Sequence, residues 1–101
     1  MYQASKQRLE KVLLHRGMYE IETDLGRAIS FVAGFDAANN GFILEGFREW
    51  FLEKFLNDYS EPFSWLFLVE RELQKIGQDE KKKVDRFVEI IIEFLENTRT
   101  E

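Results

Sequence analysis

Apolar residues recur at three- and four-residue spacing in five separate stretches of the chain, and this periodicity most constrains its fold. Such spacing places the apolar side chains on one face of an α-helix. No stretch alternates apolar and polar residues for long enough to predict a β-strand. Since 101 residues suit one domain, we expect an all-α, single-domain bundle of about five helices over residues 1–101. The predicted helices cover about residues 3–15, 24–39, 44–56, 62–76 and 80–95.

Glycine, proline and helix-capping residues lie between these five stretches. Gly17, Gly41 and Gly77 follow the first, second and fourth stretches, where a glycine with a positive φ often ends a helix. Pro62 suits the first turn of the fourth helix, because no backbone N–H is needed there. The residues expected to cap helix N-termini are Thr23 or Asp24, Ser60 or Glu61, and Asp79.

Ten phenylalanines are the unusual feature of the composition. Full burial of one such ring contributes about 1.5–3 kcal/mol, so we expect most of them in the core. The fourth helix is expected to bury one stripe formed by Trp65, Leu66, Val69, Leu73 and Ile76. The second helix is apolar on most sides, which predicts a central position for it. Its other face carries the small residues Ser30, Ala33, Gly34 and Ala37, which predicts close packing of a neighbouring helix. The aromatic residues predicted to be buried are Phe35, Phe47, Trp50, Phe51, Trp65 and Phe87.

The charge is negative overall but unevenly distributed. The net charge is −5, and residues 1–16 carry four cationic side chains and one acidic one, so the remaining residues sum to −8. This balance argues against nucleic acid as a partner and favours a basic protein partner. The run DEKKKVD at 79–85 places Lys81–Lys83 between acids, and we interpret it as the solvated start of a helix.

Nothing in the sequence indicates secretion or a membrane. The chain has no cysteine, and its first residues lack the apolar core of a signal peptide. The longest apolar runs, such as WLFLV, are far shorter than a membrane span requires. We therefore expect a cytoplasmic protein.

Residues that carry catalytic or metal chemistry are sparse. His15 is the single histidine, so a two-histidine metal site cannot be assembled. A catalytic triad would have to use His15 with a serine, and no serine lies in a sequence that resembles a nucleophile elbow. No glycine-rich phosphate loop is present. Glu89, Glu93 and Glu96 share one face of the last helix, which we interpret as a solvated stripe. We expect no catalytic residue, no metal and no cofactor. The alternative is an enzyme with a polar pocket in the core, and Asp36, which lies among apolar residues, is the best candidate for a residue of such a pocket.

Several short motifs occur in an order that resembles a group of small bacterial all-α proteins. These proteins typically carry Arg-Pro-Gly-Met-Tyr, a Gly-Phe-x-x-Trp helix and an acidic, Phe-rich last helix. They are identified as immunity proteins of polymorphic toxin systems, including contact-dependent growth inhibition. Here the proline is missing and Glu20 replaces a usual glycine. The matching segments are RGMY at 16–19, AISFVAGFDAA at 28–38, GFREWFLEKF at 46–55 and SW at 64–65.

The resemblance implies a cytoplasmic inhibitor that binds the cognate toxin domain of its own system. Toxin domains of this kind are often nucleases with basic clefts, which an acidic protein can occupy. The alternative from another class is a small regulatory or adaptor protein that dimerises through a Phe-rich face. We expect a monomer or a weak dimer.

If the five helices alternate up and down, the linker at 15–24 lies at the same end as the 57–62 linker and Glu96. That end would form an acidic pole around two tyrosines, opposite a basic pole with Lys6 and Lys81–Lys83. The alternative is that these acids only cap helices or face solvent. The predicted partner-binding residues are Tyr19, Glu20, Glu22, Asp24, Asp58, Tyr59 and Glu61.

Overall fold

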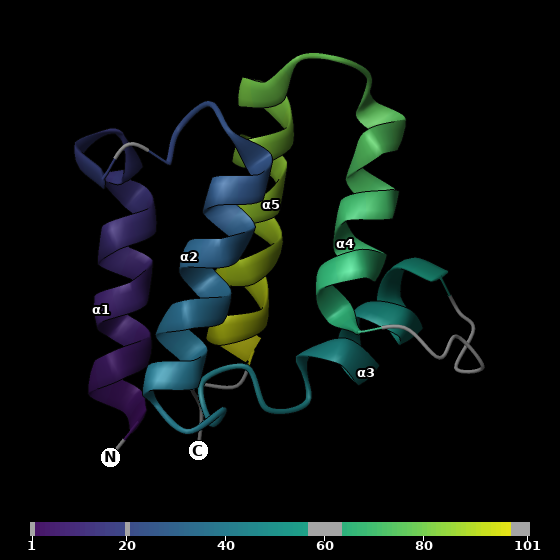
Figure 1. Ribbon diagram of the computed structural model, residues 1–101. Coiled ribbons are helices and arrows are strands. Elements are labelled where there is room, and N and C mark those ends of the chain that lie inside the picture. Colours follow the sequence, from purple (N-terminus) through teal and green to yellow (C-terminus); the bar gives the residue numbers. More distant parts are fainter. Residues whose placement is uncertain (1, 20, 57–63, 98–101) are drawn as a thin grey trace.

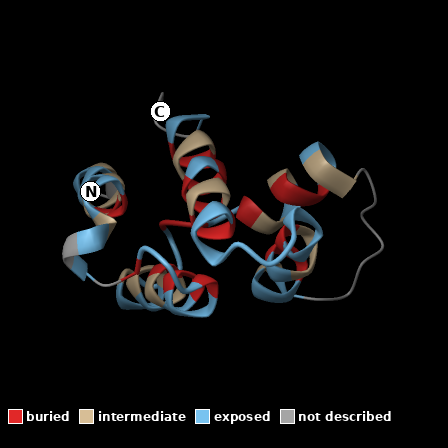
Figure 2. Cartoon of the chain, turned by 90° about the horizontal axis from the view of Figure 1, so that it is seen from above, coloured by how far each residue is buried: buried red, intermediate tan, exposed pale blue. Residues whose placement is uncertain are grey.

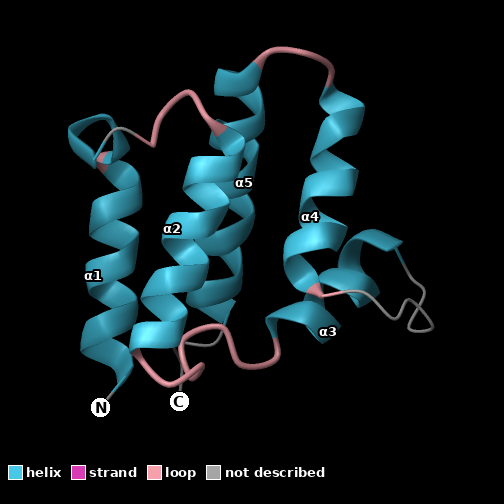
Figure 3. Cartoon of the chain, in the orientation of Figure 1, coloured by secondary structure: helices cyan, strands magenta, loops and turns pink. Residues whose placement is uncertain are grey.

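Helices make up the regular structure of the computed structural model, which describes residues 2–19, 21–56 and 64–97 (Figure 1). No β-strand occurs within these ranges, so the all-α prediction is confirmed (Figure 3). Shorter segments are the 3₁₀-helical η1 (Arg16–Tyr19) and η3 (Gln74–Ile76) and the π-helical η2 (Leu52–Leu56). The five α-helices are α1 (Tyr2–Leu14), α2 (Leu25–Ala38), α3 (Phe47–Phe51), α4 (Trp65–Leu73) and α5 (Glu80–Asn97).

The short helix α3 changes the expected topology. In the view of Figure 1, α1 runs upward, α2 runs downward, α4 runs upward and α5 runs downward, while α3 lies at the lower end. With five residues, α3 is too short to cross the bundle. The 15–24 linker therefore lies at the same end as the connection between α4 and α5, and the C-terminal end of α5 lies at the opposite end. The predicted strict alternation of five helices is wrong.

The last helix, α5, occupies the centre of the bundle. It contacts α1, α2 and α4. Eight of its eighteen residues are buried, whereas α2 buries four. The view from above shows the buried residues of the helices turned toward one another and the exposed ones turned outward (Figure 2). Our prediction that the second helix is central is wrong, because α5 has the wider apolar surface.

The face of small residues on α2 is not packed against a neighbouring helix of the described structure. Ser30, Gly34 and Ala37 are exposed, and Ala33 is half-buried. A Cβ added at Gly34 would meet no atom of a neighbouring helix within 4 Å. The small side chains therefore do not serve the close helix approach that we predicted for them.

Phe47 lies at the centre of the aromatic part of the core. Its ring centroid is 5.1 Å from that of Phe94 and 5.3 Å from that of Trp65. Phe47, Phe51 and Phe87 are fully buried, as predicted. The remaining predicted core rings, those of Phe35, Trp50 and Trp65, are only partly buried and pack against the edge of the core.

The buried stripe of α4 agrees in part with the one predicted: Val69 and Leu73 are buried and Trp65 packs against the core. Leu68 is buried as well, whereas Leu66 and Ile76 are exposed. The predicted stripe followed a regular helix as far as Ile76. The 3₁₀ segment η3 after Leu73 changes the helical phase, so Ile76 no longer follows that stripe.

Three glycines have a positive φ and mark breaks between helices. Gly41 has φ 76°, as predicted, and Gly77, where the fourth helix was predicted to stop, has φ 123°. Gly46 has φ 83° directly before α3, which therefore begins at Phe47 and not near Leu44. Gly17 does not have a positive φ; it lies within η1, so its predicted role as a left-handed helix end is wrong.

Side chains cap two helix N-termini as predicted. The Asp24 carboxylate accepts a hydrogen bond of 3.0 Å from the backbone N–H of Arg27, and Asp79 accepts one of 3.2 Å from Lys82. The helix α4 begins at Trp65, after Ser64 in an extended conformation. Pro62, Ser60 and Glu61, predicted for that start, lie outside the described residues.

We expect Asp24→Ala to lower the free energy of unfolding by about 1 kcal/mol, because a backbone N–H of α2 loses its acceptor. Chemical denaturation followed by circular dichroism measures this change. Asp24→Asn is the matched control, since an asparagine side chain can accept the same hydrogen bond. Equal losses in the two variants would contradict a capping role.

Candidate functional site

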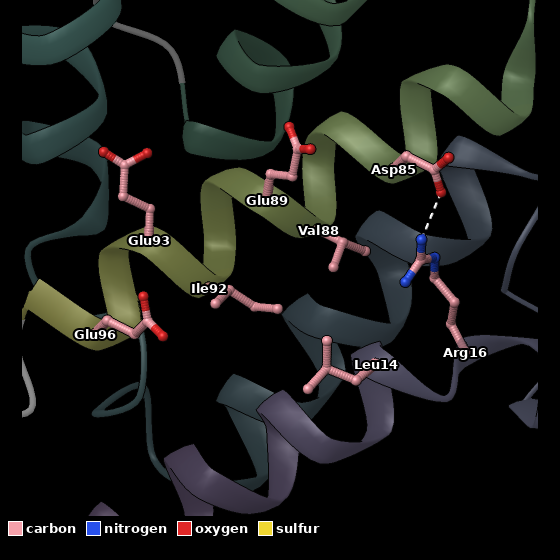
Figure 4. Close-up of a pocket in the computed structure, with 8 residues that line it drawn as sticks. All are labelled: Leu14, Arg16, Asp85, Val88, Glu89, Ile92, Glu93 and Glu96. Atoms are coloured by element: carbon pink, nitrogen blue, oxygen red, sulfur yellow. Dashed lines mark hydrogen bonds and ion pairs between the residues drawn. The ribbon is translucent and has the colours of Figure 1, made fainter.

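A groove of about 480 Å³ lies between the end of α1 and the outer side of α5. Two residues at the end of α1 and in η1 form one wall, and six residues of α5 form the floor and the opposite rim (Figure 4). The lining residues are Leu14, Arg16, Asp85, Val88, Glu89, Ile92, Glu93 and Glu96.

Three aliphatic side chains form the apolar part of the groove. Val88 and Ile92 are four residues apart on α5, and Figure 4 shows both directed toward the side of the groove that α1 occupies. Leu14 approaches from the last residue of α1 and is 64% exposed, although its neighbour Leu13 is fully buried. An exposed leucine beside a half-buried isoleucine leaves apolar surface uncovered.

Carboxylates follow the solvent side of α5 next to this apolar strip. Asp85, Glu89 and Glu93 are spaced by four residues and Glu96 follows three later, so they form a continuous row on one side of the helix. With Arg16 as the only cation in the lining, the groove carries a formal charge of −3. This row includes the three glutamates that we interpreted as a solvated stripe.

An ion pair closes the upper end of the groove. Arg16 Nη2 lies 2.5 Å from Asp85 Oδ1, and Arg16 Nη1 donates a 2.8 Å hydrogen bond to the carbonyl oxygen of Leu13. Lys81 Nζ lies 3.1 Å from the other oxygen of Asp85. The Arg16 guanidinium thus joins the end of α1 to the first turns of α5.

The other rim carboxylates also have cationic neighbours. Glu93 forms an ion pair with Lys54 of η2, and Glu89 lies 3.2 Å from Arg86 Nη1. Both pairs are partly exposed. Exposed pairs of this kind contribute about 0–1 kcal/mol each, so they hold the carboxylates only loosely.

The predicted partner-binding residues of the linker lie at a different place from this groove. Tyr19 is exposed, and its ring centroid lies 6.2 Å from that of Phe31. Glu22 and Asp24 are exposed too. The four other predicted residues, Glu20, Asp58, Tyr59 and Glu61, lie outside the described residues.

The linker does not form an acidic pole together with Glu96. The backbone N–H of Leu25, at the end of the linker, donates a 3.0 Å hydrogen bond to Glu80 Oε1, so the linker adjoins the first turn of α5. That turn holds Lys81–Lys83, and Glu96 lies at the other end of the helix. The predicted separation of an acidic and a basic pole is therefore wrong, because α3 does not cross the bundle.

Lys83 is the one buried charged residue in the described part of the chain. Its Nζ donates a 2.8 Å hydrogen bond to Gln74 Oε1 and lies 3.2 Å from Glu80 Oε2. We interpreted Lys81–Lys83 as solvated, which is wrong for Lys83. Its stem is covered while its ammonium group binds η3 to α5.

Two carboxylates that hold the linker region against α5 have a lowered pKa. The hydrogen bond from Arg16 lowers the pKa of Asp85, and Lys81 adds to this effect. The backbone N–H of Leu25, followed by Lys83, lowers the pKa of Glu80. Both groups therefore favour the folded state in their charged form.

We expect the free energy of unfolding to fall as the pH drops below about 5, because Asp85 and Glu80 lose their charge-dependent contacts. A lowered pKa stabilises the folded protein above the pKa of the unfolded chain, and this stabilisation is lost as the pH falls through the folded value. In Asp85→Asn, the decrease in the free energy of unfolding between pH 7 and pH 3 should be smaller by about 1 kcal/mol or less, since the Arg16–Asp85 pair is partly exposed. Urea denaturation between pH 7 and 3 tests this, and parallel profiles for both proteins would contradict it.

His15 and Asp36 have structural contacts outside the groove. Nδ1 of His15 lies 3.0 Å from the carbonyl oxygen of Lys11, at the end of α1. Asp36 is half-buried, and its Oδ1 accepts a 2.9 Å hydrogen bond from the backbone N–H of Leu44. Within the described ranges, no three histidine or acidic side chains lie close enough together to hold a metal ion.

Comparisons with known proteins add no relative. No family model matches the chain, and no curated protein or solved structure is significantly similar to it. Among the helices that the structure describes, none is both long and apolar enough to cross a membrane. The groove between α1 and α5 is therefore the feature on which a functional proposal depends.

Proposed function

We propose that the protein is an immunity protein, which binds the cognate toxin domain of a contact-dependent growth inhibition or similar toxin system and neutralises it. The observation that carries the proposal is the groove between α1 and α5, with its apolar strip and its row of four carboxylates. The order of short sequence motifs that resembles immunity proteins supplies the class of partner.

An apolar strip beside a row of carboxylates suits a basic protein surface. The aliphatic side chains exclude water from the contact, and the carboxylates attract the partner and orient it. A nuclease-type toxin has a basic substrate cleft, and the net charge of −5 accelerates association with such a surface. Inhibition then requires binding alone and no chemistry by this chain.

The proposal is tested with the gene next to the one that encodes this chain. We expect a large secreted protein with a variable C-terminal domain to be encoded directly upstream. Expression of that domain alone should stop bacterial growth, and co-expression of this chain should restore it. A toxic domain that this chain neither binds nor neutralises would contradict the proposal.

A regulatory protein that acts by homodimerisation is the second candidate. Leu66 and Phe67 are exposed side by side on α4 and favour it, although Phe47, Phe51, Phe87 and Phe94 are buried and cannot form a Phe-rich contact face. Sedimentation equilibrium of the chain alone separates the two candidates. A mass that doubles with concentration favours the dimer, and a constant monomer mass favours the inhibitor.

A further inference from the structure

We propose that the groove between α1 and α5 binds an amphipathic, basic α-helix of the partner protein, laid antiparallel along α5. This inference rests on the proposed function only in assuming that the partner is a basic protein. It specifies the secondary structure, charge pattern and direction of the segment that enters the groove.

The dimensions of the groove favour a helix as its occupant. Its α5 residues extend from Asp85 to Glu96, which at 1.5 Å per residue is about 16 Å, or three helical turns. The apolar side chains of Val88 and Ile92 lie one turn apart and face Leu14 across the groove. Val88 is buried at the floor of the groove, so the apolar surface left to cover belongs to Leu14 and Ile92. A helix with apolar residues at three- and four-residue spacing can cover both side chains with one face.

The carboxylates favour cations at matching positions on that helix. Glu89, Glu93 and Glu96 follow a spacing of four and three residues, so lysines or arginines with the same spacing can reach all three. Lys54 and Arg86 already accompany Glu93 and Glu89 in partly exposed pairs. Since such pairs contribute about 0–1 kcal/mol, cations from a partner can replace them at little cost.

The ends of the groove differ in charge, and this sets the direction. Arg16 and Lys81 stand at the end next to Asp85, whereas Glu96 and the C-terminal end of α5 stand at the other. Binding of a helix is more favourable when the negative end of its dipole, at the C-terminus, lies near these cations and the positive end, at the N-terminus, lies near Glu96. The bound helix is thus antiparallel to α5.

The test uses the full chain and two synthetic peptides of about 18 residues, long enough for a stable amphipathic helix. Both contain the same leucines and lysines; one has the leucines at helical spacing, and the other has them scrambled. We expect the amphipathic peptide to bind at least about tenfold more tightly by fluorescence anisotropy. Its binding should shift the NMR amide signals of Leu14, Val88 and Ile92.

A paramagnetic spin label tests the direction. On the N-terminal residue of the peptide, the label should broaden the signals near Glu96. Placed on the C-terminal residue, it should broaden those near Asp85. The reverse pattern would overturn the antiparallel arrangement.

Two variants with the same change in charge localise the binding. Leu14→Lys places a cation in the groove, and lysine suits the C-terminal end of α1, so the fold is kept. We expect it to weaken binding of the amphipathic peptide by about tenfold or more. Phe67→Lys, at an exposed position on α4, should leave binding within about twofold.

Equal affinity for the two peptides, equal effects of the two variants, or NMR shifts centred on another surface would each overturn the proposal. These outcomes are independent of the growth assay. A chain that neutralises its toxin while failing the peptide test retains the proposed function and loses the helix-binding groove. A chain that binds the amphipathic peptide in the groove but neutralises no toxin retains the groove and loses the proposed function.

Discussion

Phe47→Ala is expected to lower the free energy of unfolding by about 3–5 kcal/mol, a large part of the 5–15 kcal/mol typical of a small domain. Phe47 is fully buried, and its ring contacts those of Trp50, Phe51, Trp65 and Phe94 at centroid distances of 5.8, 6.0, 5.3 and 5.1 Å. Removal of the ring leaves a cavity where α3, α4 and α5 meet. The melting temperature should fall by about 12 °C or more, as differential scanning calorimetry would show.

Phe67→Ala provides the matched control for this prediction. The Phe67 ring is 49% exposed on α4, and the Arg71 guanidinium lies 5.7 Å from its centroid. Loss of this ring should cost about 1 kcal/mol or less. Similar losses in both variants would show that Phe47 is not the centre of the core.

The helices could be predicted from the sequence because local patterns determine where they lie. The apolar periodicity of residues 80–95 and the cap at Asp79 agree with α5, and Asp24 begins α2 as expected. The topology could not be predicted in the same way. The topology depends on the third predicted helix. The positive φ of Gly46 delays the start of this helix to Phe47, and the π-helical η2 replaces its last turns.

The candidate groove was not predicted because its two walls are far apart in the sequence. Arg16 and Asp85 are 69 residues apart, and only the packing of α1 on α5 brings them together. One sequence signal does indicate the groove. Leu14 directly follows the buried Leu13, so it cannot share the same buried stripe, and the glutamate row of α5 adjoins two aliphatic residues.

Replacing Glu89, Glu93 and Glu96 together by glutamine is expected to weaken toxin binding by about 10- to 100-fold and to abolish protection in the co-expression assay. The formal charge of the groove rises from −3 to 0, while side-chain size and the apolar strip are kept. The fold should persist, because Glu89 and Glu96 are exposed and the Glu93–Lys54 pair is partly exposed, so that its loss costs about 0–1 kcal/mol. Calorimetric titration at two salt concentrations measures the loss and its electrostatic origin.

A second triple variant separates a local effect from a change in net charge. Glu45, Glu49 and Glu53 are exposed in and beside α3, and their replacement by glutamine alters the net charge by the same three units. This control should protect cells as well as the natural sequence does. Equal loss in both variants would show that overall charge, and not the groove, governs binding.

The 15–24 linker gives the competing prediction. If Tyr19, Glu22 and Asp24 form the contact surface, Glu22→Gln with Asp24→Asn should remove protection, and the groove variant should keep it. Asparagine preserves the cap of α2, so the double variant changes charge without loosening the helix. Since Arg16 belongs to both the linker and the groove, only this comparison of neutral substitutions assigns binding to one of the two surfaces.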